Sequence, residues 1–223
     1  SGPRVYRPEV EISSPKLGES FNYIVNIDYK AVAKNNASAL ESERINYGFG
    51  DKPVSIYYSE TSDTRRKTLI ASNLPVGPRY QWDATAIPDG KDYRIIVEAK
   101  DNFGETSEAI SHSVTIDHSP PVFKIKADPP FSRGEDVKVT IDVNERLSGP
   151  PEVSIRQRGF RPVPLEITGG EQYLPTLGQV VRYEGVYRVI KGYDGPARIS
   201  IRGIDRAGLA GTTITSGDTF SIG

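Results

Sequence analysis

The stretch DGKDYRIIVEAKDNFG at residues 89–104 returns in a related form, DGPARISIRGIDRAG, at residues 194–208. Each copy opens with an Asp-Gly turn, continues with apolar and polar residues in alternation, and closes on a second turn that contains Gly. Alternation with a period of two is the pattern of a half-buried β-strand. Because the same turn, strand and turn recur roughly 100 residues apart, we expect two related units built from strands.

The repeat extends to both sides of these copies. The openings at residues 8–12 and 121–125 match, as do the closing strands at 113–116 and 219–222. Between them, strands are predicted at residues 21–29, 54–59, 67–72, 79–82, 93–99, 137–143, 153–158, 163–167, 180–190 and 198–203. About seven short strands over about 100 residues are typical of an immunoglobulin-like sandwich. The predicted fold class is therefore all-β, with two tandem immunoglobulin-like (fibronectin-III-like) antiparallel β-sandwiches.

The joint between the units is predicted at Asp117-His118-Ser119-Pro120-Pro121. Two consecutive prolines fix φ and donate no backbone hydrogen bond, so a short and stiff linker is expected. We therefore place one domain at residues 4–118 and the other at residues 119–223.

Composition limits the chemistry that this chain can perform. The 28 basic and 29 acidic side chains give a formal net charge of −1, which does not favour nucleic acid or an anionic membrane as a partner. The chain has no Cys, which excludes disulfides and thiolate sites, and it has only two histidines. No apolar run approaches the roughly 20 residues that cross a bilayer, so direct membrane insertion is not expected.

Catalytic constellations are weak in this sequence. Residues 117–119 contain the three residue types of a serine-hydrolase triad, but such triads are assembled from separate loops, and neighbouring residues on an extended chain point in different directions. Several aspartates, among them Asp89 and Asp194, lie in predicted turns beside Gly, where an Asp side chain is favoured for local hydrogen bonding. We predict that the chain is not an enzyme and has no catalytic residues.

The first unit resembles a known family at residues 54–59, 69–71, 80–90 and 92–101. These phrases are similar to the immunoglobulin-like and fibronectin-type-III-like modules of secreted proteases, glycoside hydrolases, and S-layer or other envelope proteins of bacteria and archaea. The resemblance covers residues 8–121, whereas residues 159–183 of the second unit depart from the pattern. It implies an extracellular or cell-surface location and a spacer, assembly or binding role.

A calcium ion at the joint is the one cofactor that the sequence suggests. In a sandwich of this topology, loops carrying Asp89, Asp117, Glu145 and Asp205 are expected at neighbouring poles. Their carboxylates are the hard oxygen ligands that calcium prefers, although the spacing matches no recognised calcium loop. The alternative is that Asp205, next to Arg206, pairs locally or caps a turn.

Three further features are candidates for surface or core roles. A basic patch interleaved with an aromatic ring, formed by Arg156, Arg158, Phe160 and Arg161, could hold phosphate or carboxylate groups, or could be an ordinary solvated strand face. Asn36 begins an N-glycosylation sequon. Trp82 is predicted to plug the core rather than to stack on sugars.

Two functions remain open at this point. The first is a non-catalytic spacer or assembly segment of a modular, S-layer-like surface protein, with neighbouring modules or a surface lattice as partners. The second is an accessory or carbohydrate-binding module of a secreted hydrolase or protease, with cell-wall polysaccharide as a partner.

Overall fold

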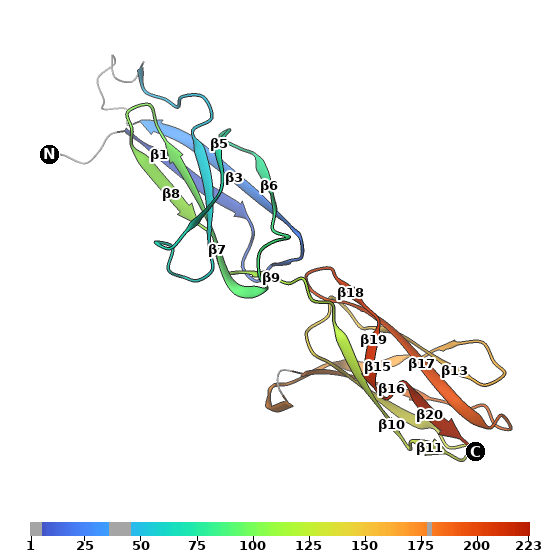
Figure 1. Ribbon diagram of the computed structural model, residues 1–223. Coiled ribbons are helices and arrows are strands. Elements are labelled where there is room, and N and C mark those ends of the chain that lie inside the picture. The colour runs from blue at the N-terminus through green and yellow to red at the C-terminus, as the bar shows by residue number, and fades with distance from the viewer. Residues whose placement is uncertain (1–5, 36–45, 178–179) are drawn as a thin grey trace. The chain divides into compact units, whose positions relative to one another are not determined.

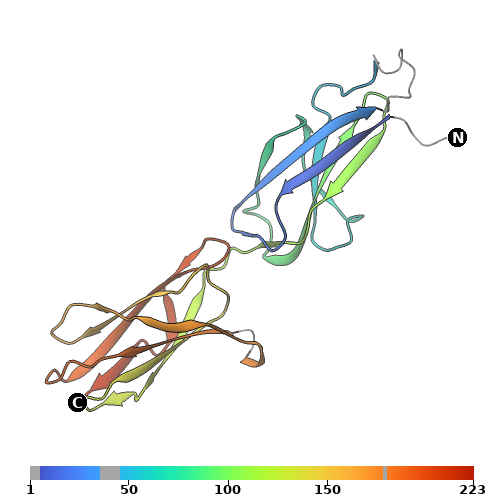
Figure 2. The same ribbon diagram turned by 180° about the vertical axis from the view of Figure 1, so that it is seen from behind.

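The structure is a computed structural model that describes residues 6–35, 46–177 and 180–223. The chain divides into two compact units, Ser1–His118 and Ser119–Gly223. Each unit consists of two packed β-sheets, seen from two sides in Figures 1 and 2. In the described residues, no helix is long and apolar enough to span a membrane.

The first unit packs a three-stranded sheet against a larger one. The strands are β1 (Tyr6–Ser14), β2 (Ser20–Phe21), β3 (Ile24–Asn35), β4 (Val54–Ser59), β5 (Thr68–Leu74), β6 (Arg79–Asp83), β7 (Gly90–Lys100), β8 (Thr106–Ile110) and β9 (Val114–Ile116). One sheet has the order β1-β3-β6, and the other has β2-β9-β7-β4-β5 with β8 also pairing with β7. Neighbours are antiparallel except β2 and β9, which run parallel.

The second unit has the same plan with additional strands. Its elements are β10 (Val122–Asp128), β11 (Phe131–Ser132), β12 (Val137–Val143), β13 (Glu152–Gln157), β14 (Val163–Pro164), β15 (Ile167–Leu174), a 3₁₀ turn (Pro175–Leu177), β16 (Val180–Tyr187), β17 (Gly195–Ile204), β18 (Ala210–Gly211), β19 (Thr213–Ser216) and β20 (Thr219–Ile222). The sheets are β15-β16-β12-β10-β19 and β11-β20-β17-β13-β14, with β18 beside β17.

This strand order confirms the predicted fold class. In the second unit, β10, β12, β16 and β15 lie side by side in the order A-B-E-D of an immunoglobulin sheet, opposite β13, β17 and β20 in the order C-F-G. Among its described residues, the first unit has the same order but no strand in the place of β15. The segment at residues 159–183, which departs from the repeat, thus contains the strand that distinguishes the two units.

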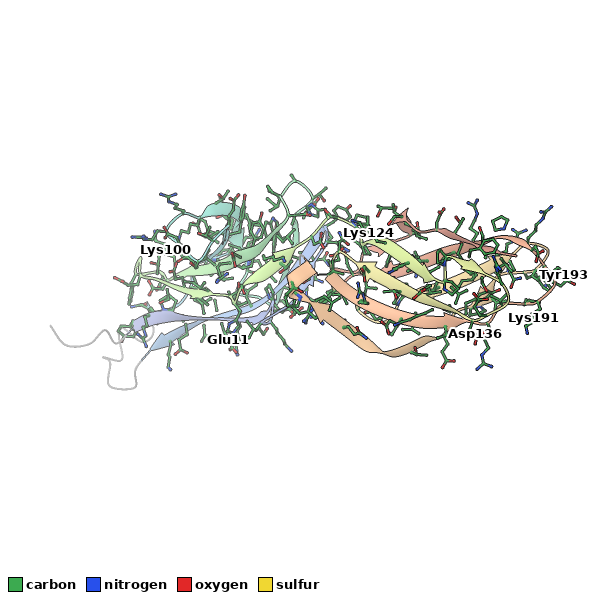
Figure 3. All side chains as sticks on the ribbon, turned by 90° about the horizontal axis from the view of Figure 1, so that it is seen from below. Glu11, Lys100, Lys124, Asp136, Lys191 and Tyr193 are labelled. Carbon is green, nitrogen blue, oxygen red and sulfur yellow. The ribbon has the colours of Figure 1, made fainter. Side chains whose placement is uncertain are left out.

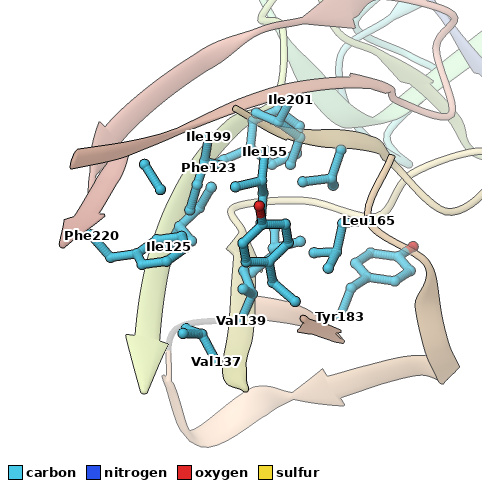
Figure 4. Close-up of a cluster of buried hydrophobic side chains, with 14 of the residues drawn as sticks. Phe123, Ile125, Val137, Val139, Ile155, Leu165, Tyr183, Ile199, Ile201 and Phe220 are labelled. Atoms are coloured by element: carbon cyan, nitrogen blue, oxygen red, sulfur yellow. The ribbon is translucent and has the colours of Figure 1, made fainter. Parts of the chain in front are cut away.

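Each unit has its own hydrophobic core. In the first unit, Trp82 is 5% exposed and stacks on Tyr58 with ring centroids 5.0 Å apart, which confirms its predicted core role. The Tyr93 hydroxyl donates to the carbonyl of Pro88 in the arrangement known as a tyrosine corner. In the second unit, Phe123 and its neighbours from both sheets fill the space between the layers (Figure 4).

The repeat in sequence reflects equivalent positions in structure. Asp101 and Asp205 are both buried, and each accepts the backbone N–H of the residue four positions later, Glu105 and Leu209, through Oδ1 at 2.8 Å. The same two pairs are joined a second time, because each aspartate donates its own N–H to the carbonyl of that later residue. The aspartates therefore close the same turn in both units.

The chain enters each unit at one pole and leaves it at the other. In the first unit, β1 begins opposite the end of β3, while β9 ends beside Phe21, just before β3 begins (Figure 1). In the second unit, β10 begins beside Asn144, and β20 ends beside Ser132 at the other pole. Since β3 is 12 residues long, entry and exit of the first unit lie roughly 40 Å apart.

Candidate functional site

The four carboxylates of the predicted calcium site belong to two different units. Asp89 and Asp117 lie in the first unit, in the turn before β7 and directly after β9, whereas Glu145 and Asp205 lie in loops of the second unit. Within the second unit, carboxylate oxygens of Glu145 and Asp205 come within 4.8 Å of each other. The interdomain calcium site therefore stays a prediction.

Asp89 has a partner within its own unit. Its Oδ1 accepts the backbone N–H of His118 at 2.9 Å and lies 3.5 Å from Nδ1 of the same histidine. The His118 ring in turn stacks on Tyr23, with centroids 5.0 Å apart and planes 10° apart. This contact ties the end of the unit to its Asp-Gly turn, and the second histidine, His112, is exposed elsewhere on the unit.

Asp205 closes a turn, as the alternative interpretation of the sequence expected. Its Oδ1 accepts the N–H of Leu209 at 2.8 Å, and its carbonyl accepts the N–H of Gly208 at 3.0 Å. Such local bonds explain why an aspartate occupies this buried position. They account for the conformation of the turn without a bound ion.

The basic patch is exposed, and the structure enlarges it. Arg156 lies on β13, and Arg158, Phe160 and Arg161 lie in the turn between β13 and β14. The Phe160 ring packs edge-on against Tyr193, with centroids 4.3 Å apart. Tyr193 is 48% exposed and lies at one end of the second unit (Figure 3).

The enlargement comes from β17, where Arg198 and Arg202 share the outward face with Arg156. Arg198 is the direct cross-strand partner of Arg156, and Ser200 is that of Ser154. The alternation in residues 194–208 already places these arginines on one face of a strand. Only the register between β13 and β17 shows that they extend the basic patch.

A buried glutamine fixes the turn beside this patch. Gln157 is 1% exposed and holds Ile190 on both sides, accepting its N–H at 2.8 Å and donating to its carbonyl at 2.9 Å. Nε2 of Gln157 also donates to the carbonyl of Tyr193 at 3.3 Å, and the Tyr187 hydroxyl donates to Oε1. The loop that carries Tyr193 is thereby anchored to β13.

The arginine on the outer face of the opposite sheet has a different environment. Arg182 donates to both carboxylate oxygens of Asp142, at 2.7 and 2.9 Å. This hydrogen bonding raises the pKa of the Arg182 guanidinium, in keeping with a bidentate ion pair. Nearby, Nζ of Lys138 lies 3.5 Å from Oε1 of Glu184.

An open cavity of about 720 Å³ lies beside the enlarged patch. Glu152, Ser154, Ser200 and Arg202 line it with polar groups, while Val153 and Leu165 supply apolar surface. This volume falls within the range of about 300–1,000 Å³ that is usual for ligand sites. Asn36, the predicted glycosylation site, lies outside the described residues.

Comparisons with known proteins identify similar structures but no family. No protein-family model and no curated protein matches the sequence. Among solved structures, a chain of a 1.5-MDa bacterial ice-binding adhesin is 12% identical, with a TM-score of 0.44, and the match covers 98% of this chain and 65% of that one. The FN1-FN3 domains of chicken CNTN1 are 11% identical, with a TM-score of 0.40 and coverage of 93% and 66%. The chain thus spans less than two thirds of the length of either structure.

Proposed function

We propose that this chain is a non-catalytic spacer or assembly segment of a modular extracellular or cell-surface protein of the S-layer-like kind. The observation that carries the proposal is the passage of the chain from pole to pole in each unit. A module with its entry and exit at opposite poles adds its full length to a string of modules. Its partners are neighbouring modules of the same polypeptide or of a surface lattice.

The last strand of each unit is fastened in a way that suits this role. In the first unit, the N–H groups of Thr115 and Asp117 donate to the carbonyls of Glu19 and Phe21, at 3.2 and 2.9 Å. These bonds cross between parallel strands, so a pull along the chain strains them together, in shear, rather than one after another.

The second unit has an equivalent pair of hydrogen bonds at its last strand, and we call each such pair a clamp. The N–H groups of Ser221 and Gly223 donate to the carbonyls of Pro130 and Ser132, at 3.0 and 2.8 Å. The two pairs of bonds occupy equivalent places at the exit strands β9 and β20. We therefore expect the last strand of each unit to resist extension in the same manner.

The resemblance of residues 8–121 to modules of secreted and envelope proteins supports an extracellular or cell-surface location. The arginines of β13 and β17 favour a second candidate, an accessory or carbohydrate-binding module of a secreted hydrolase or protease. The two candidates differ in one requirement. A carbohydrate-binding module needs a surface that binds a ligand, whereas a spacer does not.

Single-molecule pulling through the two termini tests the spacer proposal. We expect two all-or-none unfolding steps, each releasing on the order of 35 nm of chain, because each unit contains about 100 residues. Thr115→Pro removes one N–H of the first clamp and should lower the force of one step only. Thr115→Val keeps that N–H and is the matched control. Gradual extension without force steps would contradict the proposal.

A further inference from the structure

The outward face of β13 and β17 carries Arg156, Arg198 and Arg202, and Arg158 lies exposed in the turn directly after β13; we call these four residues the arginine face. Within the part of the chain that the structure describes, none of the four makes an ion pair. Arg156 and Arg198 are direct cross-strand partners. Like charges directly opposite each other destabilise strand pairing, and no ion pair among the described residues relieves the repulsion between these two.

One acidic residue shares this face without neutralising it. Glu152 is the cross-strand partner of Arg202, but the two do not form an ion pair. Elsewhere on the surface of the same unit, the Arg182 guanidinium forms a bidentate ion pair with Asp142. The guanidiniums of the arginine face are thus available for an external anion.

The surroundings of the arginine face supply contacts of a different kind. Ser154 and Ser200 lie opposite each other, between the Arg156–Arg198 pair and the Glu152–Arg202 pair, and both line the cavity of about 720 Å³ together with Glu152 and Arg202. At the other end, Tyr193 presents a half-exposed ring that Phe160 supports from the side. Cations, hydroxyls and an aromatic ring therefore follow one another along about 20 Å of strand.

We propose that the arginine face binds a linear polysaccharide that carries carboxylate groups. Guanidinium groups bind carboxylates through two parallel hydrogen bonds, so arginines spaced along a strand match a chain with regularly spaced carboxylates. The serine hydroxyls and the cavity accommodate the sugar hydroxyls, and the Tyr193 ring offers a stacking surface. This inference goes beyond the spacer role and does not depend on it.

Other polyanions fit this surface less well. Duplex DNA requires a wide basic face that neutralises many phosphates, and the chain has a net charge of −1. An anionic membrane would attract a cluster of lysines or arginines next to exposed apolar residues, whereas the arginines here alternate with serines on a strand.

Calorimetric titration of the full chain with oligogalacturonate, an oligosaccharide of carboxylate-bearing sugars, tests the proposal. We expect saturable binding that weakens as salt is added. The double variant Arg156→Gln/Arg198→Gln should bind at least tenfold more weakly. It should melt at the same temperature or higher, because the like-charge pair is gone. The variant Arg156→Lys/Arg198→Lys keeps both charges but loses the bidentate geometry. Its affinity for oligogalacturonate should lie between that of the unchanged chain and that of the glutamine variant.

A matched control removes the same number of positive charges from the opposite sheet of the same unit. Lys124→Gln/Lys126→Gln removes two exposed cations of β10 and should bind within about twofold of the unchanged chain. Equal loss in both double variants would show that only net charge matters, and would overturn the proposal. Failure of the unchanged chain to bind oligogalacturonate, or binding of duplex DNA or phosphatidylglycerol vesicles instead, would overturn it as well.

Discussion

The Tyr187 hydroxyl donates a 2.8 Å hydrogen bond to Oε1 of Gln157, and this bond joins the two sheets of the second unit. Tyr187 comes from β16 and Gln157 from β13, which lie in opposite layers. Both side chains are buried, so the pair is shielded from water. A polar group at this depth is stable only because each of its hydrogen-bonding atoms has a partner.

Gln157→Leu should destabilise the second unit by about 2–4 kcal/mol. The substitution leaves the Tyr187 hydroxyl and the backbone groups of Ile190 without their partner, and unsatisfied buried groups are costly. Urea unfolding followed by circular dichroism measures the change. Gln172→Leu, at an exposed site on β15, is the control and should change stability by less than about 0.5 kcal/mol. An equal effect of both substitutions would show that the buried hydrogen bonds do not matter.

Gly203→Ala should lower the free energy of unfolding of the second unit by about 1–3 kcal/mol. A Cβ at Gly203 would lie 2.7 Å from the ring of Phe123, so the core would have to shift. In the first unit, the repeat places Ala99 where the second has Gly203, and Val10 where it has Phe123. Thermal unfolding of the variant measures the cost, with Gly149→Ala as the control, since a Cβ there meets nothing within 4 Å. If Gly203→Ala left the stability unchanged, the Phe123 ring would not be the reason for a glycine at position 203.

The first unit should lose stability as the pH falls below about 4. The Arg79 guanidinium, hydrogen-bonded to Asp28 across β3 and β6, holds the pKa of that carboxyl below its usual value. A lowered folded-state pKa gives stabilisation that is complete above the unfolded pKa of about 3.9 and is lost as the pH falls through the folded value. Asp28→Asn should therefore lower the melting temperature by a few degrees at pH 7, and by less at pH 2. A difference that does not shrink with falling pH would contradict this account.

The calcium prediction is tested by metal addition and removal. If the carboxylates of Asp89, Asp117, Glu145 and Asp205 hold calcium, the ion stabilises the folded chain by about 2.7 kcal/mol at a concentration one hundred times its dissociation constant. We expect a higher melting temperature with calcium than with chelator. The variant Glu145→Gln should reduce the difference, and an unchanged melting temperature in the unmodified chain would refute the prediction.

The sequence was sufficient for the strands whose two faces differ in environment. Alternation located β4 at residues 54–59 and β20 at residues 219–222 with the bounds that the structure has. It did not locate β15, because Gly169 and Gly170 interrupt the alternation and a register shift separates Thr168 from Gln172. A strand that is exposed along most of its length leaves no periodic apolar signal.

The candidate site was only partly predictable for a related reason. The sequence identified Arg156 and Arg158 because they lie close together in the chain. Arg198 is about 40 residues further on, and it joins them only through the pairing of β13 with β17. Pairing register depends on the whole sandwich, so a surface assembled across strands cannot be obtained from the pattern of either strand alone.

The central claim is that the chain contains two self-contained cores, and the single tryptophan gives a direct test of it. Trp82 is buried in the first unit, so its fluorescence follows the unfolding of that unit, whereas circular dichroism follows both. Phe123→Ala removes a fully buried ring from the second core and should cost that unit about 3–5 kcal/mol. We predict that, in denaturant titrations of the full chain, this substitution lowers the midpoint of the second unit seen by circular dichroism and leaves the Trp82 midpoint unchanged. A Trp82 midpoint that falls in parallel would show one continuous cooperative core and contradict the account.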